Sequence, residues 1–232
     1  ENIKNFRQGV LPGLAVLGFA VGLLLLQPDL GTAISFVCVG LLLFFIAGIR
    51  LEQLLGLIGL SIPVVYVLIF SVPYRKKRIL AFLNPWLDPR GSGFQIIQAQ
   101  IALGSGGILG LGLGQSKQKL FFLPAAHTDF IFSIISEELG LLGAATVIIL
   151  FAFFFLNCIK IISRVKESFG KLLGFGLTAK ILLAAIINIG VNVGLFPTKG
   201  LPLPFVSYGG SALVFDMAAV GLLLNIARYS EI

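Results

Sequence analysis

The sequence predicts an all-α, polytopic membrane protein with about six transmembrane helices, and composition and patterning support this. Hydrophobic residues make up 57% of the 232 residues and charged residues only 12%, against about 25% in soluble domains. The mean hydropathy is +1.03. Apolar runs recur along the chain, each near the ~20 residues that a membrane-spanning helix needs. The net charge is +7. The basic residues lie between these apolar runs, which favours contacts with anionic lipids and excludes a nucleic-acid partner.

The apolar runs define the expected elements of one membrane domain. Spans are predicted near residues 10–27, 30–48, 54–72, 131–157, 174–195 and 209–227. The fourth run is longer than a bilayer requires, so we expect it to tilt or to project beyond the bilayer. An even number of spans places both chain ends on one side. Because an apolar run begins within ten residues of Glu1, the chain is interpreted as a fragment of a longer protein.

The connection near residues 73–128 is too long for a simple turn and is predicted to be a large loop opposite the chain ends. It carries seven basic residues and one acid, Asp88. Its basic segment YRKKR (74–78) can anchor the chain to lipid phosphates or bind an anionic substrate, and the sequence leaves both open. Each side of the membrane receives eight Lys and Arg residues, so charge counting gives no orientation.

A glycine-rich stretch, residues 104–114, lies within this connection. Its continuation GLGLGQSK (110–117) resembles a phosphate-binding loop but lacks the strand and helix such a loop needs. We expect close backbone packing or a mobile loop here. Phosphate binding by its amides is the lesser alternative.

The segment LPAAHTDFIF (123–132) places a carboxylate at the start of the fourth span. Thr128 is expected to cap this helix, which would put Asp129 in its first turn. Asp129 can complement the helix dipole or act as a general base on a hydroxyl. His127 is the only histidine, so a histidine metal site or a Ser-His-Asp triad has almost nothing to build on.

Further polar residues lie inside the apolar runs. Glu137 and Glu138 are expected to pair structurally with basic loop residues, because unpaired carboxylates are costly in a membrane. Lys180 and Asp216 are predicted to form an interhelical charge pair, although Lys180 can also snorkel to the membrane surface. The two cysteines, Cys38 and Cys158, are interpreted as small core residues and not as a disulfide or metal pair.

Together these motifs resemble the SEDS family (shape, elongation, division, sporulation). Within the family the chain is more similar to the cell-division branch, FtsW, than to the elongation branch, RodA; Trp86 and Lys199 favour that choice. The resemblance covers nearly the whole chain, in order, through QPDLGT (27–32), NPWLDPRGSGFQIIQ (84–98), GLGLGQSKQKL (110–120), LPAAHTDFIF (123–132), EELG (137–140) and PTKGLPLPFVSYGGS (197–211).

The resemblance implies the last six helices of a ten-helix bacterial inner-membrane protein at the division septum, with residues 73–128 as its large extracellular loop. It implies a glycosyltransferase that polymerises lipid II into glycan strands. The implied partners are a class B penicillin-binding protein, which is a transpeptidase, and other divisome proteins. Ala125 stands where the family usually has Glu, so a role of that Glu in holding a cation or the loop is not carried over.

The implied site centres on Asp129 as the general base on the acceptor hydroxyl. No metal cage is expected; a divalent cation, Mg²⁺ or Mn²⁺, would be shared with the substrate diphosphate. Two rival functions remain, a lipid II flippase and a non-enzymatic scaffold for the penicillin-binding protein. Substrate-binding candidates are Arg75, Arg78, Lys117, Lys119, His127, Lys199 and Ser207.

Overall fold

The computed structural model describes residues 5–230, and this part of the chain is helical with no strands. Its elements are the π-helix η1 (Phe6–Val10), α1 (Leu11–Leu26), α2 (Leu30–Ile46), α3 (Leu51–Phe70), α4 (Pro73–Leu83), the 3₁₀-helix η2 (Pro85–Leu87), α5 (Phe94–Ser105), α6 (Gln118–Phe121), α7 (Ile131–Arg164), α8 (Ser168–Asn192) and α9 (Gly210–Ser230).

Five helices in this range are long and apolar enough to cross a membrane: η1 with α1, α3, α7, α8 and α9. The other predicted span, α2, has 17 residues and a length of about 26 Å, slightly less than a hydrocarbon core of about 30 Å. α7 continues to Arg164, well beyond the apolar run near residues 131–157. The expected all-α, multi-pass membrane fold is confirmed.

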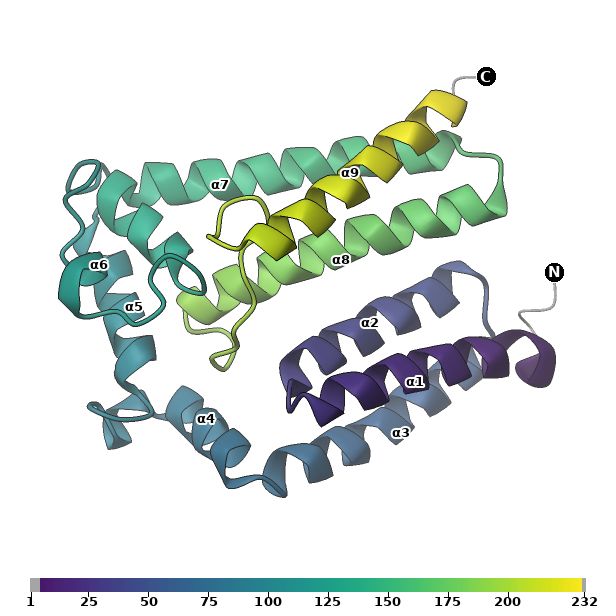
Figure 1. The fold of residues 1–232 in the computed structure, drawn as a ribbon, viewed down its shortest axis with the longest axis horizontal. Helices are drawn as coiled ribbons and strands as arrows, with labels where there is room; N and C mark the ends of the chain where they lie inside the picture. The colour runs from purple at the N-terminus through teal and green to yellow at the C-terminus, as the bar shows by residue number, and fades with distance from the viewer. Residues whose placement is uncertain (1–4, 231–232) are drawn as a thin grey trace.

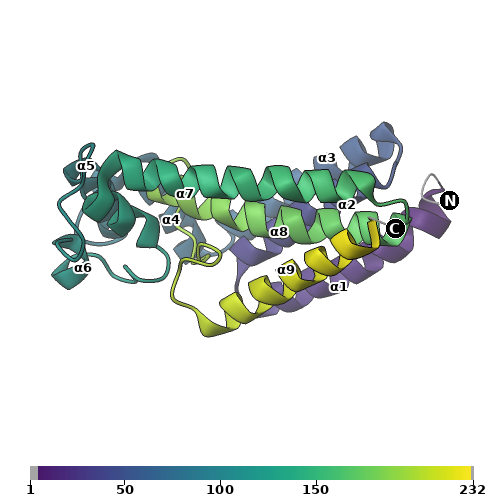
Figure 2. The same cartoon turned by 90° about the horizontal axis from the view of Figure 1, so that it is seen from above.

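The long helices form two groups joined by α2 (Figures 1 and 2). α7, α8 and α9 pack against one another, and α1 packs with α2, which contacts α8. The beginning of α1 and the end of α9 lie at one end of the molecule, while α5 and α6 lie at the other. This matches the expected placement of the chain ends opposite the long connection.

The long connection contains helices that the sequence analysis treated as part of a loop. α4 begins at Pro73, whose fixed φ suits the first turn of a helix. α5 packs against α7 and α8 through buried side chains spaced along its length. These are Ile96, Ile97, Ala99 and Ala102, and they fix the connection to the bundle.

α7 is interrupted at Gly140, where φ is +67° and ψ is −163°. Only glycine adopts this backbone conformation without strain. The glycine-rich stretch fills the break: Leu111 N donates to Glu137 O at 3.0 Å, and Leu141 N donates to Gly107 O at 2.9 Å. The prediction of close backbone packing by residues 104–114 is therefore confirmed, and the segment before the break carries the Asp129 end of α7.

Candidate functional site

Asp129 lies in a turn just before α7 and not in its first turn. The N-cap of α7 is Phe130, so the prediction that Thr128 caps the helix is wrong. The reason is a competing turn around Ala125 O, which accepts from Thr128 Oγ1 at 3.2 Å and from Phe130 N at 3.4 Å, the hydroxyl and one of the amide groups that a Thr128 cap would use. Ala125 has φ +56°, a left-handed conformation that is strained for a residue with a side chain. The turn moves Asp129 out of the helix and into the space beside residues 197–209.

The main chain of Asp129 is held by two asparagines of α8. Asn188 Nδ2 donates to Asp129 O at 2.9 Å and Asn192 Nδ2 donates to the same oxygen at 3.1 Å. Asn188 Nδ2 also donates to Leu201 O at 2.7 Å. Since the asparagines are four residues apart, they lie on one face of the helix. They join the start of α7 to the connection between α8 and α9.

The carboxylate of Asp129 is half-buried, and no group within residues 5–230 donates a hydrogen bond to it. Burial raises the pKa of this carboxyl group above its ordinary value, and the charge of Arg78 opposes the rise. Gly200 lies beside it, and a Cβ built there would be 3.3 Å from Asp129 Oδ2. An unpaired carboxylate with a raised pKa is suited to accept a proton.

The two arginines of the basic segment in α4 have different contacts. Arg78 Nη1 donates to Thr198 O at 3.2 Å, and its guanidinium lies 4.5 Å from the centre of the Tyr74 ring. These contacts hold its charge near Asp129. Arg75 instead donates to Leu68 O at the end of α3, at 2.8 Å. The structure thus brings Arg78 to the site and gives Arg75 a structural contact.

Lys199 fixes the connection between α8 and α9 to the start of α2. Its Nζ donates to Gly31 O and, at 2.5 Å, to Ser35 Oγ. Burial lowers the pKa of Lys199 to about 8, while the charge of Asp29 raises it in part. Lys199 is the residue before Gly200, so it positions the segment that lies against Asp129.

Ser207 and His127 occupy the other side of the turn. Ser207 Oγ donates to Thr128 O at 2.6 Å and accepts from Leu203 N at 2.7 Å. His127 O accepts from Tyr208 N at 2.9 Å, and the His127 side chain is exposed. Ser207, through its hydroxyl, and His127, through its main-chain carbonyl, therefore help to hold the turn that contains Asp129.

Lys117 and Lys119 belong to a separate cluster around the first half of α7. Lys119 Nζ pairs with Glu138 Oε1 at 2.5 Å. The fully buried Glu137 accepts from Lys117 N at 3.0 Å and also from Ser116 Oγ. The expected pairing with a basic loop residue is confirmed for Glu138, which neutralises the Lys119 charge. Glu137 is instead held by the serine hydroxyl and main-chain amides of the same loop.

Lys180 of α8 and Asp216 of α9 form the ion pair between helices that the sequence analysis expected. Asp216 is buried, whereas the side chain of Lys180 is 50% exposed. Both cysteines are free, and Cys158 is buried as expected. Cys38 is exposed on α2, so its interpretation as a core residue is wrong. An apolar helix in a membrane can present cysteine outward without loss.

Residues 5–230 contain no group of three or more His, Cys, Asp and Glu side chains that could hold a metal ion. The donor set around Asp129 therefore does not form a protein cage for a resident cation.

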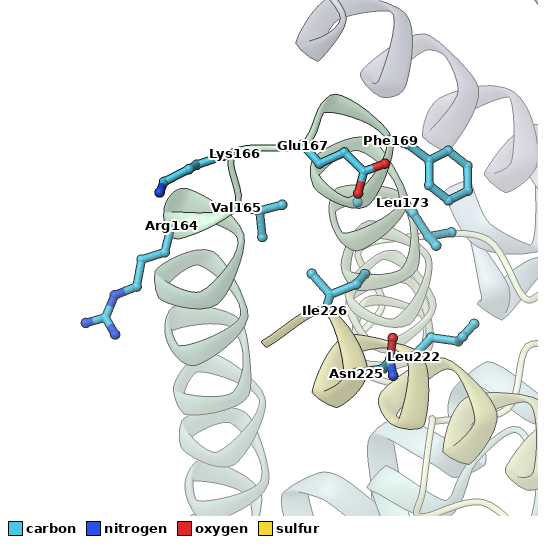
Figure 3. A pocket seen from close by; sticks show the side chains of 10 residues that line it. Arg164, Val165, Lys166, Glu167, Phe169, Leu173, Leu222, Asn225 and Ile226 are labelled. Carbon is cyan, nitrogen blue, oxygen red and sulfur yellow. The ribbon is translucent and has the colours of Figure 1, made fainter. Parts of the chain in front are cut away.

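A cavity of about 550 Å³ lies at the opposite end of α7 and α8 (Figure 3). Its walls are mainly apolar, with Glu167 pointing toward the cavity and Arg164 and Lys166 pointing away. It is at the other end of the long helices from Asp129, so it is not part of the Asp129 site.

Sequence reasoning missed Asn188, Asn192 and Gly200 as parts of the site. A signal was present for the asparagines, because two amides four residues apart in an apolar run need buried partners. Gly200 carried no such signal, since its closeness to Asp129 depends on how the chain folds.

The chain matches a known family along its whole length. The FtsW/RodA/SpoVE family, described as "Cell cycle protein", matches residues 1–232. The chain belongs to this family. It is 47% identical over 227 residues to a probable peptidoglycan glycosyltransferase FtsW of Geobacter metallireducens, covering 98% of this chain and 60% of that protein. It is 48% identical over 233 residues to stage V sporulation protein E of Bacillus subtilis, covering 100% of this chain and 63% of that protein.

Solved structures share this fold. A chain from a peptidoglycan synthase complex that coordinates polymerization and crosslinking matches with a TM-score of 0.78 and 32% identity, covering 98% of this chain and 63% of that chain. The rod shape determining protein RodA of Thermus thermophilus matches with a TM-score of 0.61 and 25% identity, covering 97% and 60%. The expected SEDS membership and FtsW-like character are confirmed. The chain spans about 60% of the length of these relatives.

Proposed function

We propose that the protein containing this chain is a peptidoglycan glycosyltransferase that polymerises lipid II, with Asp129 as its general base. The observation that carries this proposal is the half-buried Asp129 carboxylate, which is held by its main chain and left without a hydrogen-bond donor within residues 5–230. A similar FtsW protein is named a probable peptidoglycan glycosyltransferase, which agrees with this chemistry.

The proposed reaction joins two lipid-linked disaccharides. The acceptor GlcNAc 4-hydroxyl attacks the anomeric carbon of the donor MurNAc, and Asp129 takes the hydroxyl proton. A glycosidic bond forms, and the bond from the anomeric carbon to the polyprenyl diphosphate breaks. The diphosphate leaves with the electron pair. Arg78 lies close enough to Asp129 to affect its carboxyl group, so its charge can stabilise the departing diphosphate.

A lipid-linked substrate also needs an apolar surface next to this chemistry. A groove of about 840 Å³ runs between α1, α2 and α8, with an almost entirely apolar lining. Leu201 lines the groove and directly follows Gly200, which lies beside Asp129. A polyprenyl chain placed there would hold its diphosphate at the Asp129 end.

The proposal extends to the setting of the reaction. One structural relative belongs to a complex that couples polymerization to crosslinking, so we infer a class B penicillin-binding protein as the partner. The FtsW-like character favours the division septum of the bacterial inner membrane, with other divisome proteins nearby. Any Mg²⁺ or Mn²⁺ would arrive with the diphosphate of the substrate, since the donors around Asp129 form no cage for it.

The test is lipid II polymerisation by the purified full-length protein with its partner, comparing native protein with Asp129→Asn. We expect glycan polymer from the native protein and none from the variant, because Asn cannot accept the proton. Asn157→Ala is the matched control; Asn157 is a half-buried α7 residue whose amide donates to Phe153 O in its own helix, at 2.7 Å. Equal polymer from Asp129→Asn, with partner binding intact, would refute the general-base role.

The two rival functions predict different results. A flippase needs no proton acceptor at the outer surface, so Asp129→Asn would leave lipid II transport across vesicles intact. A scaffold would give no polymer from the native protein in the absence of another polymerase. The unpaired carboxylate beside Arg78 favours the transferase over both, because neither rival needs a proton acceptor there.

A further inference from the structure

A buried polar network links Asp129 to α8, in a part of the bundle that is otherwise apolar. Asn188 is 1% exposed and Asn192 and Ser133 are fully buried. Their amide and hydroxyl groups need partners there, because leaving a buried polar group unpaired is destabilising. Each of the three side chains has such partners, and the network ends at the carbonyl of Asp129.

Both the oxygen and the nitrogen of the Asn192 amide have hydrogen-bond partners. Asn192 Oδ1 accepts from Ser133 N at 3.1 Å and from Ser133 Oγ at 2.6 Å. Asn192 Nδ2 donates to Asn188 O at 2.8 Å in addition to Asp129 O. Since the N-cap of α7 has no side-chain cap of its own, Asn192 supplies an acceptor for its first turn from a neighbouring helix.

The contacts also restrict how the Asp129 side chain can point. Two amides hold the carbonyl oxygen of Asp129, which fixes the backbone on its C-terminal side. Asn188 holds Leu201 O with the same amide group, and this keeps Gly200 beside the carboxylate. Nothing in this network touches the carboxylate itself, so the oxygen atoms remain available to a substrate hydroxyl.

We propose that Asn188 and Asn192 are positioning residues that orient Asp129 for proton transfer through its main chain. This inference rests on the proposed function of Asp129. Neither asparagine contacts the reacting atoms. They act by holding the start of α7 and the segment at residues 200–201 in one arrangement around the carboxylate.

The first test compares steady-state polymerisation by full-length native protein, Asn188→Ala and the control Asn157→Ala, each with the partner present. Misplacing a reacting group by about 1 Å reduces rates by about 100-fold. We therefore expect kcat of Asn188→Ala to fall by about that factor while KM changes little, because substrate contacts are kept. Native kcat and KM in folded Asn188→Ala would overturn the proposal.

A second readout does not depend on activity. Infrared titration of the Asp129 carboxyl, identified by its absence in Asp129→Asn, reports how buried that group is. Arg78 is the charged group that acts on it. A loosened turn admits water, so in Asn188→Ala the pKa should move down toward the ordinary value for aspartate. An unchanged titration would mean that the asparagines do not hold the carboxylate in place.

A milder substitution distinguishes a positioning role of the asparagines from a role in folding alone. Ser133→Ala removes one hydroxyl contact to Asn192 and leaves both asparagines present. If Asn188→Ala fails to fold, we expect folded Ser133→Ala still to show reduced kcat and a lowered Asp129 pKa. Native values for both would overturn the proposal. Polymerisation that survives in Asp129→Asn would refute the general-base role on which this proposal rests, while the infrared titration would still test whether the asparagines hold the carboxylate in place.

Discussion

Gly140→Ala is expected to destabilise the protein strongly, because the break in α7 depends on glycine. At φ +67° and ψ −163° a residue with a Cβ is strained by about 1–3 kcal/mol. That Cβ would also lie 2.4 Å from Gly110 N and from Ile108 O. Backbone atoms cannot yield as a side chain does, so the glycine-rich stretch must move away.

Moving this stretch breaks hydrogen bonds that close the gap in α7. Three of these bonds, donated by Leu111 N, Gly112 N and Leu141 N, are 2.9 to 3.0 Å long. Each contributes about 1 kcal/mol net. Together with the backbone strain, the expected loss is roughly 4–6 kcal/mol. In a chain of this size 1 kcal/mol corresponds to about 2–4 °C, so the unfolding midpoint should fall by roughly 10–20 °C.

The assay is thermal unfolding of the purified full-length protein in detergent, with Gly221→Ala as the matched control. Gly221 lies in α9, and a Cβ there meets no atom within 4 Å. Alanine is the better helix former by about 1 kcal/mol, so the control should be neutral or slightly stabilising. Equal midpoints for Gly140→Ala and Gly221→Ala would refute the claim that the break requires glycine.

Three further predictions concern the Lys180–Asp216 ion pair between α8 and α9, the titration of Asp129, and access to Asp129. Asp216→Leu leaves Lys180 unpaired and should lower stability by about 1–3 kcal/mol, with recovery in the Lys180→Leu, Asp216→Leu double variant; an unchanged midpoint would contradict the pairing. Burial raises the pKa of Asp129, so between its unfolded pKa near 3.9 and the raised folded value the folded protein binds more protons than the unfolded chain. Stability therefore falls as pH rises through that window, and Asp129→Asn should unfold at a higher temperature at pH 7 but not near pH 3. Gly200→Ala places a methyl group 3.3 Å from Asp129 Oδ2 and should slow polymerisation by roughly tenfold in folded protein; a native rate would argue against crowding there.

The sequence was sufficient for the parts of the fold that depend on local composition. Long apolar runs require helices in a membrane because every backbone group must be satisfied internally. The helices near those runs were therefore predictable, and so was the pairing of Lys180 with Asp216, since neither charge is stable alone among apolar helices. α5 was not predicted, because a 12-residue helix inside a glycine-rich connection is too short to mark a span.

The site was only partly predictable for a related reason. Asp129 stood out as a carboxylate at the predicted start of a span, but the local pattern left helix-dipole complementation open, and the general-base role came from the family resemblance. Its surroundings come from residues 59 and 63 positions away, Asn188 and Asn192, whose contacts exist only after α7 and α8 pack. The error over Thr128 has the same origin. Capping preference favours a helix that starts after Thr128. In the folded chain Ala125 O instead accepts hydrogen bonds from the amide groups of this turn.

The absence of a donor at the Asp129 carboxylate within residues 5–230 connects these findings to function. Among the other buried or partly buried acids, Glu137 accepts hydrogen bonds from Ser116 Oγ and Lys117 N, while Glu138 pairs with Lys119 and Asp216 pairs with Lys180. An acid paired in this way is stabilised in its charged form and is a poor base. Asp129 lacks such a partner, yet two amides and a turn hold its backbone firmly. This combination reduces the stability of the resting protein at neutral pH and leaves the carboxylate free to accept a proton from a bound hydroxyl.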